Sequence, residues 1–298
     1  MKSELIFVLL LALVLDRALG EPPDAWHPTV FMGRVIDFLD RRLGSGAVVL
    51  LTASIGFTAV TYEILSLAEG MLLLAVSAVI LKTTFSWRGL QDYTTPIANA
   101  VAAGDIAGAR KYIPFIAGRN PAALSEKELV STTVESIAES SVDSMISPLL
   151  FYAVFSTLSL EAGVSAAVCY RVVNTMDSML GRPENPKGLV PAKTDEAFNF
   201  IPARLGAVLL LVSGWMLRFP VGNGLRIFKR DRNTTASRNA GQTISAMAGL
   251  LRVELEKQGS YKLGDPMVEF GARHIYEALR IVDLQIMILA ALMVIFWM

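Results

Sequence analysis

Two groups of polar residues have the types and spacing that a cation or phosphate site needs. In the first, Glu135, Glu139 and Asp143 follow one another at intervals of four, so a helix would place all three on one face. Three acids on one face repel one another unless a cation sits between them. The residues around them are largely apolar, so this helix is expected to pack against other parts of the protein. The alternative is an ordinary solvated helix surface.

The second group is Arg171, Asn174 and Asp177, at intervals of three on another helix that is expected to end at Gly181. Most residues between them are apolar. A buried structural ion pair is the simpler interpretation, but such a pair is costly to desolvate and adds little stability. Asn174 beside Asp177 fits a metal or phosphate site better.

Two further residues are candidates for binding phosphate. Arg204 lies at the start of an apolar segment, where it could bind phosphate near a helix N-terminus or simply extend to the lipid headgroups. Asn239 lies in the segment Ser237–Gly241, which is either an ordinary turn or a backbone nest for an anion.

The composition limits the chemistry. One cysteine and two histidines leave carboxylates as the main metal ligands, which favours a hard ion such as Mg²⁺. The net charge of zero gives no basic field for nucleic acid. The sequence has no P-loop, no dinucleotide-binding glycine motif, no H-E-x-x-H and no nucleophile elbow.

The rest of the chain is apolar, with 53% hydrophobic residues and a mean hydropathy of +0.49. We therefore predict an all-α fold, a polytopic membrane bundle with about four to six apolar helices in a single domain, 1–298. Apolar helices are expected at about 3–15, 47–66, 71–86, 149–168, 201–219 and 281–298. Polar site segments are expected at 87–147, 169–200 and 221–280. The excess of basic residues in 221–280 places that side in the cytoplasm.

Several boundaries can be predicted. A cleaved signal peptide is the alternative for the first segment, but Asp16 and Arg17 favour a helix that stays attached.

Ser125 and Glu128 fit a capping box that opens a helix running to about Ser147. The segment 149–168 is expected to be broken near Glu161 and to be re-entrant. The segments 87–125 and 182–199 contain several prolines and are expected to be loop-like.

Blocks spread over nearly the whole chain resemble the adenosylcobinamide-phosphate synthase family, the integral membrane enzymes of cobalamin biosynthesis. The blocks, in order, are Leu15–Pro23, Trp26–Pro28, Gly33-Arg34, Gly104-Asp105, Ala109-Arg110, Gly118–Asn120, Val134–Glu139 with Asp143, Tyr170-Arg171 with Asn174–Met179, Asn199–Leu205 and Asn239–Gly241. The chain departs from the usual pattern at Asn120, Ser140-Ser141 and Arg238.

The resemblance implies a reaction. The family joins adenosylcobyric acid to (R)-1-aminopropan-2-ol O-phosphate and forms an amide on a corrin side-chain carboxylate. A carboxylate does not condense with an amine in water unaided, so ATP with Mg²⁺ is the expected activator, through an acyl phosphate. The expected location is the cell membrane, with several spans in the lipid bilayer. The resemblance also allows contact with other enzymes of cobalamin assembly.

Together, the resemblance and the spacing lead to a set of expected roles. The catalytic carboxylates are Glu135, Glu139, Asp143 and Asp177. The residues that bind substrate or phosphate are Arg119, Arg171, Asn174, Arg204 and Asn239. The ligands of Mg²⁺ are Glu139, Asp143 and Asp177. One carboxylate could instead act as the base that frees the attacking amine.

Two other functions are compatible with the same residues. One is a Mg²⁺-dependent membrane transferase that acts on a phosphorylated lipid, although the sequence has no D-D-x-x-D motif. The other is an ion-coupled transporter, although most of the charges lie in the polar segments between the apolar helices.

Overall fold

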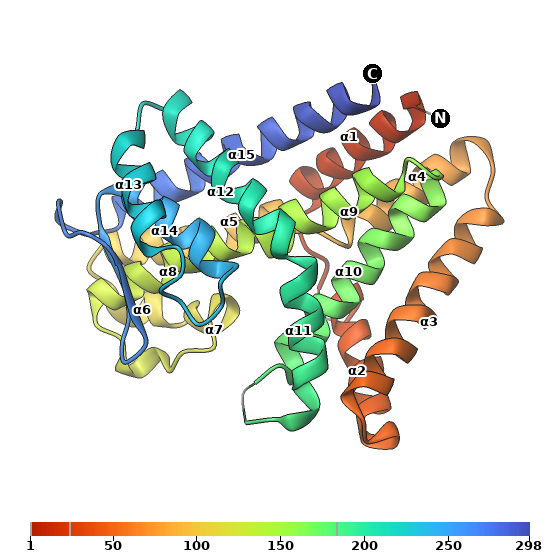
Figure 1. Cartoon of the computed structure of the whole chain (residues 1–298), viewed down its shortest axis with the longest axis horizontal. Coiled ribbons are helices and arrows are strands. Elements are labelled where there is room, and N and C mark those ends of the chain that lie inside the picture. The colour runs from red at the N-terminus through yellow and green to blue at the C-terminus, as the bar shows by residue number, and fades with distance from the viewer. Residues whose placement is uncertain (1, 24, 183) are drawn as a thin grey trace. The chain divides into compact units, whose positions relative to one another are not determined.

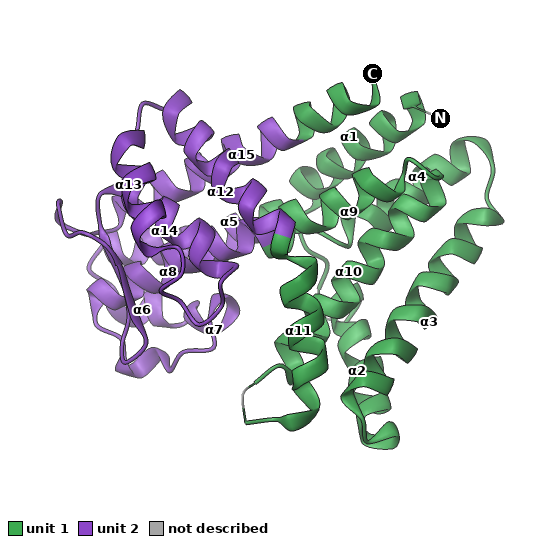
Figure 2. Ribbon diagram, in the orientation of Figure 1, with its two compact units in different colours: residues 1–88, 143–200, 290–298 green, residues 89–142, 201–289 purple. Residues whose placement is uncertain are grey.

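The computed structural model describes residues 2–23, 25–182 and 184–298 (Figure 1). The chain divides into two compact units, each built from separate stretches of sequence (Figure 2). Unit 1 comprises 1–88, 143–200 and 290–298, and unit 2 comprises 89–142 and 201–289. That 1–298 form a single membrane domain stays a prediction.

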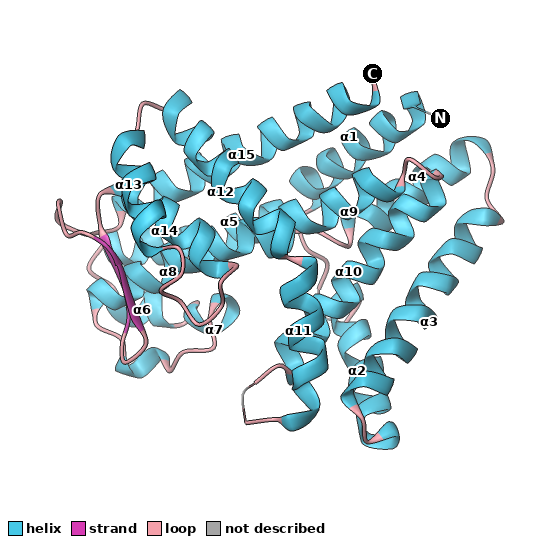
Figure 3. Cartoon of the chain, viewed as in Figure 1, coloured by secondary structure: helices cyan, strands magenta, loops and turns pink. Residues whose placement is uncertain are grey.

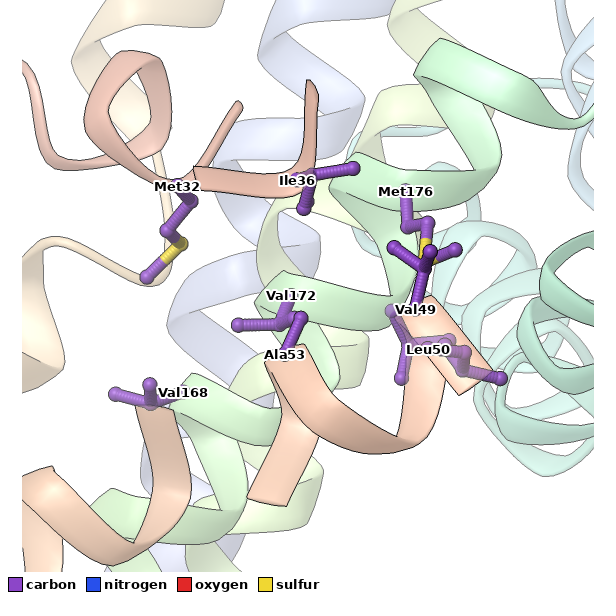
Figure 4. Close-up of a cluster of buried hydrophobic side chains, with 9 residues drawn as sticks. Met32, Ile36, Val49, Leu50, Ala53, Val168, Val172 and Met176 are labelled. Carbon is purple, nitrogen blue, oxygen red and sulfur yellow. The ribbon is translucent and has the colours of Figure 1, made fainter. Parts of the chain in front are cut away.

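Unit 1 is a group of helices around α10, which contacts α2, α3, α4, α9 and α11. The helices of this unit are α1 (Lys2–Leu19), α2 (Pro28–Leu43), α3 (Gly46–Ser66), α4 (Gly70–Lys82), α9 (Ser147–Phe155), α10 (Leu160–Leu180) and α11 (Leu189–Phe198), with the short 3-10 helix η3 (Pro186–Gly188). The sequence explains the central place of α10, because its residues from Gly163 to Ala167 are small or apolar and all buried. An apolar cluster joins α10 to α2 and α3 (Figure 4). It contains Met32, Ile36, Val49, Leu50, Ala53, Val168, Val172, Val173 and Met176.

Close packing of α9 and α10 depends on Gly163. A Cβ at this position would lie 2.7 Å from the Ser156 Cβ and 2.9 Å from the Tyr152 carbonyl oxygen. The chain turns back at Ser156–Ser159, and the Ser159 hydroxyl caps the start of α10 by accepting from the Ala162 amide. The break expected inside 149–168 is therefore confirmed, as is the end of the second helix at Gly181.

Unit 2 packs helices against a small β-hairpin, drawn in magenta in Figure 3. Its elements are α6 (Ile106–Arg110), α7 (Ile113–Ile116), η1 (Pro121–Ala123), α8 (Glu126–Ser141), α12 (Phe200–Met216), α13 (Val221–Asp231), α14 (Ala240–Leu251), β1 (Glu254–Lys257) and β2 (Tyr261–Gly264). The two strands are antiparallel, with Lys257 paired to Tyr261. Helix α8 contacts α6, α7, α14 and β1. The predicted capping box of Ser125 and Glu128 is present at its start.

Among the α-helices, α5 (Trp87–Ala102), α12 and α15 (Arg273–Trp297) contain residues of both units. Among the described residues, three segments are long and apolar enough to cross a membrane, namely 46–66, 70–102 and 273–297. The pair 186–198 and 200–216 forms a fourth if it is counted as one broken span. These findings confirm the all-α membrane fold. At nine residues, α9 is too short to cross alone, since a span needs about 20 residues.

The structure corrects three predicted boundaries. The helix that begins after Ser125 ends at Ser141, and a π-helical turn, η2 (Val142–Ile146), leads directly into α9. Pro148 does not end the helical path, because it lies in the first turn of α9, where a missing N–H is tolerated. The same reason explains why 189–198, which was expected to be loop-like, is helical, since Pro191 lies in the first turn of α11.

The third correction concerns 87–125 and 221–280. The first segment is largely helical, with Pro96 inside α5. The second segment is not simply polar, because it contains α14, in which every residue from Gly241 to Leu251 is buried. The sequence analysis did not predict this helix because many of its residues are small or polar. The hairpin β1–β2 was not predicted either.

We predict that Gly163→Ala destabilises the protein by about 1–3 kcal/mol, because the added methyl group overpacks the contact between α9 and α10. The matched control is Gly56→Ala in α3, where a Cβ would meet open space. Thermal unfolding of the detergent-solubilised protein measures both changes. Equal unfolding temperatures for the two variants would contradict the prediction.

Candidate functional site

A polar pocket of about 330 Å³ lies in unit 2, beside α8 and the β-hairpin. It is lined by Ile116, Ala117, Gly118, Arg119, Glu135, Ser136, Glu139, Lys257 and Tyr261. Glu135 and Glu139 come from successive turns of α8, while Lys257 and Tyr261 come from the two strands of the hairpin. The pocket therefore contains acidic, basic and hydroxyl groups.

Three side chains hold the carboxylate of Glu135 in this pocket, where it is only 3% exposed. The Arg119 Nη2 and the Tyr261 hydroxyl each donate to its Oε2 at 2.6 Å. The Ser131 hydroxyl donates to its Oε1 at 2.9 Å. A buried carboxylate is costly unless it is paired and hydrogen-bonded, and here both oxygens are satisfied. Glu135 is thus fixed in one orientation.

Tyr261 remains a donor because its ionised form is disfavoured. Burial raises the pKa of its hydroxyl, and the neighbouring charges of Glu135 and Glu139 raise it further. Glu139 itself is exposed. Charged groups of both signs therefore line the pocket.

A second polar network lies in unit 1 around Arg171. The Arg171 Nε donates to the Thr84 carbonyl oxygen at 2.8 Å, and its Nη1 donates to the Asn174 Oδ1 at 3.1 Å. The Asn174 Nδ2 in turn donates to the Asp195 Oδ1 at 3.2 Å. The Asn199 Nδ2 donates to the other Asp195 oxygen at 2.9 Å. Hydrogen bonds therefore run continuously from α10 to α11.

Acidic groups surround this arginine. Burial lowers the pKa of the Arg171 guanidinium, and neighbouring negative charges oppose that shift. The carboxylates that oppose it are those of Asp143, Glu21 and Asp195, whereas burial raises the pKa of the neighbouring Tyr170 hydroxyl and keeps it neutral. Asp143 is also fixed by its backbone, since the Tyr170 hydroxyl donates to its carbonyl oxygen at 3.2 Å. The predicted residues Asp143, Arg171 and Asn174 thus share one neighbourhood.

Asp177 lies farther along α10 and is half-buried. Burial raises the pKa of its carboxyl to about 6, and the charge of Asp195 contributes. Repulsion between the Asp177 and Asp195 carboxylates opposes ionisation of both, and a bound cation would relieve that repulsion. Sequence reasoning missed Asp195 of α11. It lies four residues before Asn199, a spacing that places both side chains on one face of a helix.

Sequence reasoning also missed an ionic cluster at the end of α1. Asp16 is fully buried and accepts from the Arg88 amide at 2.8 Å. The Lys82 Nζ lies 3.8 Å from the Asp16 Oδ1 and 3.2 Å from the Glu21 Oε1. Burial opposes ionisation of Glu21, but hydrogen bonds from His27 and Ser86 and the charge of Lys82 prevail and lower its pKa to about 2. No spacing rule links these residues, because 61 to 66 positions separate the two acids from Lys82.

The structure brings six of the predicted site residues together in three pairs. Arg119 meets Glu135, Arg171 meets Asn174, and the Arg204 Nη1 donates to the Asn239 Oδ1 at 3.2 Å in unit 2. Asn239 is the residue immediately before α14. These contacts show placement, and the catalytic and phosphate-binding roles stay predictions.

The predicted metal ligands belong to different units. Glu139 is in unit 2, whereas Asp143 and Asp177 are in unit 1. Within either unit, the described residues include no group of three His, Cys, Asp or Glu side chains placed to hold a metal ion. Mg²⁺ commonly takes only one or two protein carboxylates together with substrate phosphates. The proposed Mg²⁺ site therefore stays a prediction.

The fold and these polar networks define a helical membrane protein that buries an arginine and several carboxylates in its interior. The model of the CobD/Cbib protein family matches residues 9–282, and the chain belongs to this family. Cobalamin biosynthesis protein CobD of Dehalococcoides mccartyi is 36% identical over 277 residues, which cover 88% of this chain and 87% of that protein. The probable cobalamin biosynthesis protein CobD of Methanothermobacter thermautotrophicus is 31% identical over 290 residues, or 95% of each chain. No solved structure matches the chain.

We predict that Asp177→Asn stabilises the protein at about pH 7 and has little effect near pH 4. Between the ordinary pKa of 3.8 and the folded value of about 6, the folded protein holds a proton that the unfolded chain releases. The free energy of unfolding therefore falls as pH rises through this window, and the amide removes that loss.

Thermal unfolding without divalent cations measures this effect at both pH values. The matched control is Glu126→Gln at the exposed start of α8. The same gain at pH 7 in both variants, or no gain in Asp177→Asn, would contradict the prediction.

Proposed function

We propose that this protein is an amide-forming ligase that joins adenosylcobyric acid to (R)-1-aminopropan-2-ol O-phosphate. Family membership over residues 9–282 supports a role in cobalamin biosynthesis, and the curated relatives are named for that process. The observation that carries the proposal is the polar pocket of unit 2, in which Arg119 faces carboxylates within a membrane protein. Ionisable groups are costly in such proteins and commonly mark functional sites.

The proposed reaction proceeds in two steps. The corrin carboxylate attacks the γ-phosphorus of ATP and forms an acyl phosphate, with release of ADP. The amine of the second substrate then attacks the acyl carbon and displaces inorganic phosphate. The ammonium proton passes to a base, and the product is the amide.

In this reaction, the task of the arginines is to neutralise phosphoryl oxygens. Arg119, Arg171 and Arg204 are the proposed groups, since charge stabilisation supplies most of the catalysis in phosphoryl transfer. Asn174 and Asn239 contact two of these arginines and would add neutral donors. Fixed hydrogen-bond partners hold the arginines in place before substrate arrives, which reduces the cost of reorganisation.

The carboxylates have two proposed tasks. One is to accept the proton of the attacking amine, and Glu135, Glu139, Asp143 and Asp177 are the candidates. The other is to hold Mg²⁺, with Glu139, Asp143 and Asp177 as proposed ligands.

Asp177 offers oxygen atoms of the kind that a hard cation prefers, and the neighbouring acid Asp195 adds negative charge that a cation would offset. When bound, Mg²⁺ would neutralise negative charge on the phosphates. The proposed location is the cell membrane, with other enzymes of cobalamin assembly as proposed contacts.

A reconstitution assay tests the proposed function. Purified protein is mixed with ATP, Mg²⁺, adenosylcobyric acid and labelled aminopropanol phosphate, and the label is expected in a corrinoid product. A membrane transferase would instead label a lipid, and a transporter would incorporate no label in either product. Absence of labelled corrinoid from a folded preparation would reject the ligase.

We predict that Glu139→Gln and Asp177→Asn each lower kcat in this assay by about a hundredfold or more, as loss of one charge-stabilising group commonly does. Glu126→Gln on the same helix as Glu139 serves as the control and should retain wild-type turnover. If both site variants keep wild-type kcat and the same Mg²⁺ dependence, these residues have no catalytic or metal-binding role.

A further inference from the structure

The β-hairpin of unit 2 adds two side chains to the polar pocket that the proposed reaction has not used, Lys257 and Tyr261. With them, the pocket has two basic residues, Arg119 and Lys257, and two acidic residues, Glu135 and Glu139. Both signs of charge therefore line one small cavity. A ligand that matches this lining must carry both an anionic and a cationic group.

The size of the cavity limits the ligand further. Its volume of about 330 Å³ is at the lower end of the roughly 300–1,000 Å³ typical of small-molecule sites. A corrinoid, with its macrocycle and several side-chain amides, is too large for a cavity of this volume. A short amino alcohol phosphate fits it.

We propose that this pocket binds the small substrate of the ligation through both its phosphate and its ammonium group. The phosphate faces the basic side chains Arg119 and Lys257. The ammonium group faces the acidic rim at Glu139. The identity of the ligand rests on the proposed function, whereas the need for a small zwitterion rests on the charges and volume of the pocket.

Lys257 is the cation best able to adjust to the phosphate. Arg119 is already engaged through two nitrogens, Nη2 with Glu135 at 2.6 Å and Nη1 with the Thr132 hydroxyl at 2.7 Å. Lys257 is exposed, and a lysine ammonium has three rotatable donors on a flexible stem. It can therefore close on a phosphate without breaking a buried ion pair.

The hairpin also fixes the position from which Lys257 acts. Its strand partner is Tyr261, whose hydroxyl donates to Glu135. The preceding residue, Glu256, donates its backbone N–H to the Ser131 hydroxyl of α8 at 3.0 Å. Hydrogen bonds to α8 thus hold both the residue before Lys257 and its strand partner, so only the lysine side chain needs to move.

Binding to the purified full chain in detergent tests this proposal, by calorimetry with (R)-1-aminopropan-2-ol O-phosphate and no ATP or corrinoid. Lys257→Gln is expected to raise Kd about tenfold, the usual effect of losing one charge-assisted hydrogen bond. The matched control is Lys262→Gln on the neighbouring strand, whose ammonium pairs with Glu254 and Glu256 outside the pocket. Equal Kd values for Lys257→Gln and the wild type would overturn the proposal.

Two partial ligands test the requirement for both charges. Inorganic phosphate and 1-aminopropan-2-ol are each expected to bind at least about tenfold more weakly than the complete molecule, because each lacks one ionic contact. Equal affinity for either fragment would overturn the two-point assignment.

The same measurements separate this proposal from the proposed function. Tight, Lys257-dependent binding without any amide product would reject the ligase and support the pocket. Full ligation by Lys257→Gln, with an unchanged KM for the amine substrate, would support the ligase and reject the proposed role of the pocket. Thermal unfolding of each variant confirms that it is folded.

Discussion

The need to neutralise the buried Glu135 carboxylate organises the polar part of unit 2. Its oxygens bring together donors from α8, from the segment before η1 and from the hairpin. Ser131 links the same helix to the strand β1 by accepting the Glu256 amide. Removal of Arg119 would leave the buried Glu135 carboxylate without its cation, which is far more destabilising than loss of an ordinary surface ion pair. The pocket is consequently rigid on its inner wall and adaptable at its exposed rim.

Unit 1 meets a similar demand in a different way. Helix α10 is the most centrally packed helix of this unit, yet it carries an arginine among its buried residues. Carbonyl and amide oxygens satisfy the guanidinium directly, while the acidic residues Asp143 and Asp195 act on it as nearby charges. The charge is thereby dispersed over several neighbours from different helices. Such an arrangement tolerates incoming negative charge, since the arginine is not committed to one carboxylate.

Local sequence signals predicted much of the fold. The apolar runs gave most of the long helices, and Ser125 with Glu128 predicted the start of α8 because a capping box depends only on neighbours in sequence. The break before α10 and its end at Gly181 followed from polar and glycine residues in the same way. Prolines misled the prediction for 182–199, because their effect depends on whether they fall in a first turn.

The candidate site could be predicted only in part. Spacing along one helix identified Arg171 with Asn174, and the family resemblance supplied Arg119. Tyr261 and Lys82 were missed because their partners are far away in sequence, so only tertiary packing brings them into contact. Helix α14 was missed because its burial comes from close packing of small residues, which carry little hydropathy signal.

The π-helical turn at Val142–Ile146 has a consequence for how acidic residues are distributed. In an uninterrupted α-helix, Asp143 would continue the row of Glu135 and Glu139 along one side. A π turn takes one more residue per hydrogen-bonded loop, so side chains beyond it are rotated out of phase with those before it. The four-residue repeat of acids runs into this turn, since Asp143 is its second residue, and the acids of the repeat lie in two different surroundings, one beside a tyrosine of a hairpin and one beside a buried guanidinium. Deletion of one residue in this turn would restore the α-helical phase and rotate every side chain of α9 away from its present direction.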